Sequence, residues 1–187
     1  MGLNITDGKG RGYDASVSES NRLNTSSKQA RRIFYVARND ARAFTATSVD
    51  ADSAAGDIVF YLKNTSTTRN MFVKDIHVGG VNTSLWKFWV VTGTGSGAAI
   101  TPTNTNLGSG ITAEATCLGN AAVTGLTTGA LFGIVRSPAN GEIDEDFDGA
   151  LILAPNTAIA VEFDTSGSNS VTEVICAFHY EAVDRDN

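Results

Sequence analysis

The residues best suited to chemistry lie in one acidic stretch, Asp144–Gly149. Asp144, Asp146 and Asp148 alternate along it and a glycine follows, as in the first half of a calcium-binding loop. The twelfth position of such a loop supplies a bidentate glutamate, whereas this chain has Pro155 there. We therefore expect an acidic surface loop with no resident metal or cofactor, and we keep these three aspartates as the calcium candidate.

Histidine and cysteine offer few routes to catalysis. His77 and His179 are the only histidines, and both lie in stretches with the pattern of β-strands. Cys117 and Cys176 are far apart in the sequence, and neither is surrounded by the signature of a catalytic nucleophile. We expect two buried, reduced thiols and predict that the chain is not an enzyme.

Charge is distributed unevenly along the 187 residues. The formal net charge is −6, but residues 1–42 carry eight basic and four acidic side chains, a net charge of +4, and the remainder carries −10. Basic segments of this kind bind nucleic acid, anionic membranes or acidic protein surfaces. Here the basic residues are spaced among aspartate and serine without a dense run, and no apolar stretch approaches the roughly 20 residues of a membrane span. We expect a protein partner, with no nucleic acid and no membrane.

The elements that would position these residues are β-strands. Stretches rich in β-branched and aromatic residues recur at short intervals, separated by Gly, Asn, Ser and Thr. Two long connections, Gly93–Gly110 and Ser137–Gly149, are predicted to be loops. The pattern predicts an all-β, antiparallel β-sandwich of jelly-roll type (residues 31–187) preceded by an extended basic N-terminal arm (residues 1–30). The predicted strands are Tyr13–Glu19, Ile33–Ala37, Ala43–Thr47, Ile58–Lys63, Asn70–Val78, Leu85–Val91, Ala130–Val135, Ala150–Leu153, Ala158–Phe163 and Val171–Glu181.

Alternation within the strands predicts which faces are buried. In Val171–Glu181 the face with Thr172, Val174, Cys176, Phe178 and Tyr180 is the more apolar, so it is predicted to face the core. The alternation along Met71–Val78 is less regular, and Ile111–Leu118 fits either a helix or a strand. The only tryptophans, Trp86 and Trp89, are three residues apart in one strand, so they are predicted to lie on opposite faces.

Several motifs resemble small structural proteins of tailed-bacteriophage virions. They are Ile5–Val17 with Asn21–Leu23 at the N-terminus, Asp57–Ser66 with its Leu-Lys-Asn strand, Ile76–Val78 and Ala113–Thr116. The resemblance is greatest to capsid decoration (cement) proteins, which are commonly trimeric. It implies a β-sandwich on the capsid surface, a homotrimer, and the major capsid protein as partner.

The resemblance assigns no catalytic residues, so the predicted contacts come from the basic arm. Arg11, Arg22, Arg31 and Arg32 are expected to bind carboxylates of the capsid or of a neighbouring subunit. Tyr13, Val17 and Leu23 are expected to be the apolar anchors of the same segment. The alternative is a neck, head-fibre or tail component that binds a receptor or glycan, for which an exposed Trp86 or Trp89 would be the natural contact.

Overall fold

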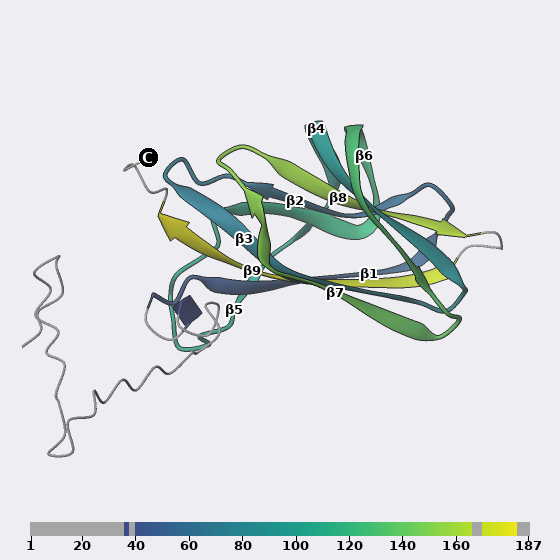
Figure 1. Cartoon of the computed structure of the whole chain (residues 1–187), viewed down its shortest axis with the longest axis horizontal. Coiled ribbons are helices and arrows are strands. Elements are labelled where there is room, and N and C mark those ends of the chain that lie inside the picture. The colour runs from purple at the N-terminus through teal and green to yellow at the C-terminus, as the bar shows by residue number, and fades with distance from the viewer. Residues whose placement is uncertain (1–35, 38–39, 166–169, 183–187) are drawn as a thin grey trace, which may run out of the picture. The chain divides into compact units, whose positions relative to one another are not determined.

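The computed structural model describes residues 36–37, 40–165 and 170–182, which form a two-layered β-structure (Figure 1). The side chains of residues 148 and 149 are outside this description. The strands are β1 (Ala43–Ser53), β2 (Ile58–Asn64), β3 (Arg69–Gly80), β4 (Ser84–Ile100), β5 (Thr103–Asn104), β6 (Ala115–Ser137), β7 (Gly141–Leu153), β8 (Ala158–Thr165) and β9 (Ser170–Ala182).

The strands form two antiparallel sheets. One sheet has five strands in the order β5-β1-β9-β3-β7, and the other joins β2, β6, β4 and β8 into a closed ring. Leaving aside the short β5, consecutive strands mostly alternate between the sheets, and the pairings β1-β9-β3-β7 and β2-β8-β4-β6 are those of a jelly roll. The predicted all-β sandwich is therefore confirmed for the described residues.

The main core lies between the two layers and is strongly aromatic. Trp86, Phe88 and Phe163 from the ring sheet are fully buried opposite Phe44 and Phe178 from the five-stranded sheet. The buried face of β9 is the predicted one, Thr172, Val174, Cys176, Phe178 and Tyr180. Alternation therefore identified the core side of this strand correctly.

A second, smaller core fills the ring formed by β2, β6, β4 and β8. It contains Tyr61, Val91, Leu118, Val123, Ala158 and Ala160. The ring closes because β4 and β6 are long enough for one end of their ribbon to pair with β8 and the other with β2. Gly93 and Gly125 lie where this ribbon bends. Both have positive φ, and a Cβ on either would lie within 2.7 Å of a backbone oxygen of the facing strand.

Two predicted loops are strands over part of their length. The predicted loop Gly93–Gly110 contains residues 93–100 of β4, and the predicted loop Ser137–Gly149 contains residues 141–149 of β7. Glycine and aspartate have low β-propensity, but cross-strand pairing with β6 and β3 outweighs that preference here. The ambiguous stretch Ile111–Leu118 leads into β6.

The predicted strand Ile33–Ala37 is wrong at the two residues described. Val36 and Ala37 are helical, and the Val36 carbonyl accepts a hydrogen bond from the Asp40 amide at 3.0 Å. The irregular alternation in β3 also has an explanation. A register shift between Val73 and Asp75 returns Ile76 to the buried face.

Candidate functional site

The residues predicted to carry binding lie outside the described part of the chain. Arg11, Tyr13, Val17, Arg22, Leu23, Arg31 and Arg32 all precede residue 36, as do the predicted arm and the strand Tyr13–Glu19. Their partners and the predicted boundary at residue 30 stay predictions.

A hollow of about 270 Å³ opens at one end of the five-stranded sheet, where β3 ends and β7 and β9 begin. Three valines in its lining are unusually exposed, Val49 by 50%, Val81 by 48% and Val171 by 43%. The backbone of Val81 is held from both sides, because its amide donates to the Val171 carbonyl and its carbonyl accepts from the Asn140 amide. The hollow therefore has a fixed apolar rim.

Two glutamates flank a glycine across this hollow. Gly79 is the register partner of Glu142 on β7 and of Glu173 on β9, so the three residues form a row across three neighbouring strands. Strands lie about 4.8 Å apart, which places the backbones of the two glutamates roughly 9.5 Å from each other. Gly79 is itself buried, and the Glu142 side chain lies against it. A Cβ there would lie 3.0 Å from the Glu142 Cγ.

The outer face of β3 and β7 beside this hollow is also acidic. Asp144 and Asp146 are exposed on β7, opposite His77 and Asp75 of β3 in the register. Lys74 contacts Asp75, and this hydrogen bond, with Asp144 and Asp146 nearby, raises the pKa of Lys74. Lys74 thus lies near the carboxylates of Asp75, Asp144 and Asp146, so the charge of this group of side chains is negative.

The loop expected around the calcium candidate is wrong in part, whereas the candidate itself stays a prediction. Asp144 and Asp146 lie in β7 and pair with His77 and Asp75 of β3, so this part of the stretch is extended. The side chain of Asp148 is not described. Within the described ranges, no three His, Cys, Asp or Glu side chains gather closely enough to hold a metal ion.

Both histidines lie on the outer face of the five-stranded sheet. His77 Nε2 is 3.0 Å from a carboxylate oxygen of Glu142, at the edge of the hollow. His179 stacks on the Phe72 ring at a centroid distance of 5.3 Å, and its Nε2 is 3.2 Å from Glu181. These contacts hold both rings against the sheet.

A second polar cluster lies on the outer face of the ring sheet. Lys87 Nζ is 2.8 Å from Glu162 and 2.9 Å from Asp164, and these two hydrogen bonds raise the pKa of Lys87. Trp89 Nε1 donates to the other Glu162 oxygen at 2.8 Å. A hollow of about 320 Å³ adjoins this cluster beside Leu85.

The two tryptophans lie on opposite faces, as predicted. Trp86 is fully buried and donates through Nε1 to the Ser137 hydroxyl at 2.9 Å. Trp89 is half-buried against the second core, with its Nε1 engaged by Glu162. Neither indole therefore stands free in a loop, where a sugar-stacking platform would be expected.

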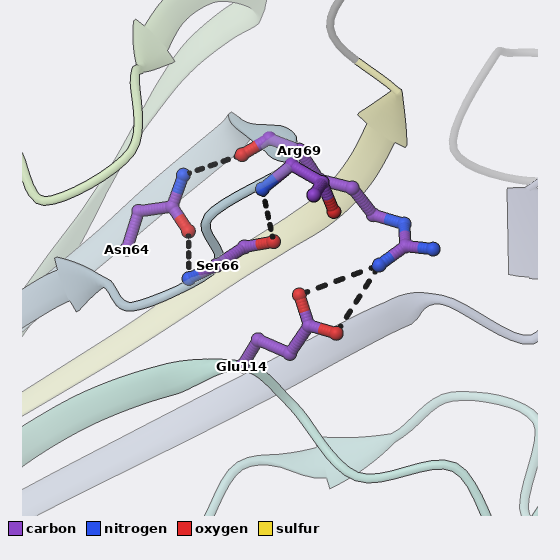
Figure 2. A network of polar contacts seen from close by, with 5 residues as sticks. Asn64, Ser66, Arg69 and Glu114 are labelled. Carbon is purple, nitrogen blue, oxygen red and sulfur yellow. Dashed lines mark hydrogen bonds and ion pairs between the residues drawn. The ribbon is translucent and has the colours of Figure 1, made fainter.

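Asn64, the last residue of the Leu-Lys-Asn strand, organises the opposite end of the sandwich (Figure 2). Its fully buried amide donates to the carbonyls of Arg69 and Leu153, both at 2.9 Å, and accepts from the Ser66 amide at 3.0 Å. Arg69 in turn reaches Glu114 at 3.2 Å. This network connects β2, β3 and β7 with the segment before β6, so its role is structural.

Cys117 and Cys176 are free and buried in the main core, which confirms the expected pair of reduced thiols. Burial raises the pKa of Cys117 to about 12 and that of Cys176 well above its ordinary value. A thiolate is the reactive form of cysteine, so both side chains are poor nucleophiles at neutral pH.

Comparison of the chain with protein-family models, curated proteins and solved structures finds no significant match. The described residues include no helix that is long and apolar enough to cross a membrane.

The hollow with its valines and glutamates was missed by reasoning from the sequence. Its residues come from four strands and the turns between them, and only the register across the sheet brings them together. The Gly79–Gly80 pair at the end of an apolar strand was the one local signal for it. The site that the structure describes best is therefore this end of the five-stranded sheet.

Proposed function

We propose that this chain is a non-enzymatic structural protein of a tailed-bacteriophage virion. In this role it decorates and stabilises the capsid by binding the major capsid protein, and it acts as a homotrimer on the capsid surface. The basic N-terminal segment provides the main contact, with Arg11, Arg22, Arg31 and Arg32 on carboxylates and with Tyr13, Val17 and Leu23 as apolar anchors.

The observation that supports this proposal most is the separation of charge. Residues 1–42 carry +4 and the rest of the chain carries −10, and exposed aspartates cluster on the outer face of β3 and β7. A basic segment on an acidic body favours association with an acidic partner and disfavours random contact between bodies. Many copies on a symmetric shell would gain avidity from contacts that are individually weak.

One fold serves many functions, and the jelly roll is compatible with this role. The support it offers is mechanical. Two packed sheets, an aromatic core and a filled strand ring leave little freedom in the body, and a rigid body suits a protein that reinforces a shell.

The test is binding of the full-length protein to capsids that lack it, measured by co-sedimentation. Changing Arg11 and Arg22 to Gln removes two charges from the segment, and we expect the number of bound copies to fall at least about tenfold. Arg136→Gln is the matched control, because Arg136 is an exposed arginine of the body, and it should bind like the wild type. Equal occupancy for the double variant and the wild type would contradict the proposal.

The alternative, a neck, head-fibre or tail component, predicts a different result. Such a protein would fail to bind the capsid shell and would instead bind cells or glycans. Binding to a glycan array that Trp89→Ala abolishes would favour this alternative over decoration.

A further inference from the structure

The ribbon formed by β4 and β6 is almost without charge. The two strands lie side by side over most of their length (Figure 1). Between Lys87 and Arg136 the sequence has a single charged side chain, Glu114, which pairs with Arg69 at 3.2 Å. Residues 43–187 as a whole carry a net charge of −10. The ribbon is therefore an uncharged region on an acidic body.

The outer face of β6 bears two exposed apolar side chains, Leu131 by 40% and Ile134 by 53%. They are the register partners of Trp89 and Lys87, whose side chains lie on the outer face of the ring sheet. A register shift between Phe88 and Trp89 keeps Leu131 and Ile134 on one face although they are three residues apart. We call these two side chains the β6 patch.

The β6 patch lies at an edge of the ring sheet. β6 pairs with β2 only from Ala115 to Gly119, so among the described residues its partner from Thr127 to Ser137 is β4 alone. The other long edge strand, β7, carries exposed carboxylates, and charges on an edge discourage contact with a further chain. β6 has no charged side chain before Arg136, so its edge lacks this protection.

We propose that the β6 patch is the surface by which copies of this chain contact one another. Leu131 and Ile134 of one copy pack against the same two residues of its neighbours, which removes their apolar surface from water. The inference rests on the proposed function, because it names the contact that holds the homotrimer together. Residues beside a three-fold axis meet their own equivalents, so one patch on each copy is enough to close a ring of three.

Electrostatics favours a second copy as the occupant of the patch. Two bodies that each carry −10 repel each other, and the repulsion is least where the surfaces that meet are uncharged. A partner with a charged surface would find no ion pair on Leu131 or Ile134. Register shifts along β6 disfavour a continuous ladder with another strand, so the contact is made by side chains.

The test is self-association of the full-length chain, measured by sedimentation velocity at micromolar concentration. The wild type should be a trimer. L131K/I134K puts two like charges on each patch, and the dissociation constant should rise about tenfold or more. V81K/V171K is the matched control, because it makes the same change at two exposed apolar residues outside the ribbon, and it should remain trimeric.

The fold of L131K/I134K is checked by far-ultraviolet circular dichroism. Its spectrum should match that of the wild type, because both substituted side chains are exposed. Dissociation with an unchanged spectrum therefore reports the contact between copies.

A cross-linking experiment locates the contact independently. Ile134→Cys is oxidised and run on a non-reducing gel, and it should give a covalent dimer, since three thiols around an axis can link only in pairs. Val171→Cys is the control and should stay monomeric on the gel. The native thiols are buried and would contribute little background.

A monomeric wild type, or unchanged association of L131K/I134K, would overturn the inference. So would an equal loss of association in V81K/V171K, or the absence of a covalent dimer with Ile134→Cys. Capsid binding is measured separately, so a monomer that binds capsids would leave the proposed decoration role standing. Conversely, a trimer that dissociates as expected and ignores capsids would reject that role alone.

Discussion

Replacing Asn64 by alanine removes one buried amide that connects four segments of the sandwich. Its side chain makes three hydrogen bonds, two donated to the Arg69 and Leu153 carbonyls and one accepted from the Ser66 amide. Each is worth about 1 kcal/mol net, and partners left buried without a bond cost more. We therefore expect Asn64→Ala to lower the free energy of unfolding by about 3 kcal/mol or more.

For a chain of this size that loss corresponds to a fall of roughly 6–12 °C in the melting temperature. The assay is urea unfolding followed by tryptophan fluorescence, with thermal unfolding as a second measurement. Asn64→Asp is an informative companion, because it keeps the acceptor for Ser66 but puts an oxygen against two carbonyls. It should be at least as destabilising as alanine.

Asn70→Ala is the matched control. Asn70 is a half-buried asparagine of the neighbouring strand β3, and its side chain makes no hydrogen bond within the described residues. It should change stability by less than about 1 kcal/mol. If Asn64→Ala were as stable as Asn70→Ala, the network of Figure 2 would not hold this end of the sandwich together.

Three further predictions concern the ribbon, the core thiol and the polar cluster of the ring sheet. Gly93→Ala or Gly125→Ala should each destabilise the protein by roughly 1–3 kcal/mol in urea unfolding, because φ is positive and a Cβ meets backbone oxygen. Gly110→Ala should cause no such loss of stability, because a Cβ at Gly110 would have no heavy atom within 4 Å. Burial raises the pKa of Cys117 from 9.0 to about 12, so its stabilising contribution is complete below pH 9 and is lost as pH rises from about 9 to 12. In Cys117→Ala the urea concentration at the midpoint of unfolding should depend less on pH in that range than in the wild type. An equal pH dependence in the two proteins would contradict the burial argument. Lys87→Met leaves the carboxylates of Glu162 and Asp164 without their cation, so it should lower the free energy of unfolding by about 1–3 kcal/mol at pH 7, as measured by urea unfolding.

Much of the fold could be predicted because the local sequence of several strands has the residue pattern of a β-strand. In β9 the apolar side chains alternate strictly, so both the strand and its buried face follow from period two. The fully buried Phe60 and Leu62 of β2 are likewise part of an apolar run bounded by polar residues.

The rest depends on pairing between distant residues. The strand β7 begins with Glu142, Asp144 and Asp146, whose types favour a loop, and only its pairing with β3 makes it extended. In the same way, the glycine-rich end of β4 is a strand because β6 lies beside it. Propensity is a weak guide where tertiary contacts decide the conformation.

The candidate site was the part least open to prediction. The arginines of the N-terminal segment could be named from charge, but the hollow at the end of the five-stranded sheet brings Val49, Val81 and Val171 together from three parts of the chain. The spacing of these valines along the sequence does not indicate that they lie close together in the fold. Register between strands supplies it.

The most direct test of the proposed role is the number of copies in purified particles of a tailed phage that encodes this chain. Quantitative mass spectrometry against the major capsid protein gives that number. Decoration of the shell predicts a stoichiometry on the order of the major capsid protein's own, amounting to hundreds of copies. Absence from the particle, or only a handful of copies, would contradict it.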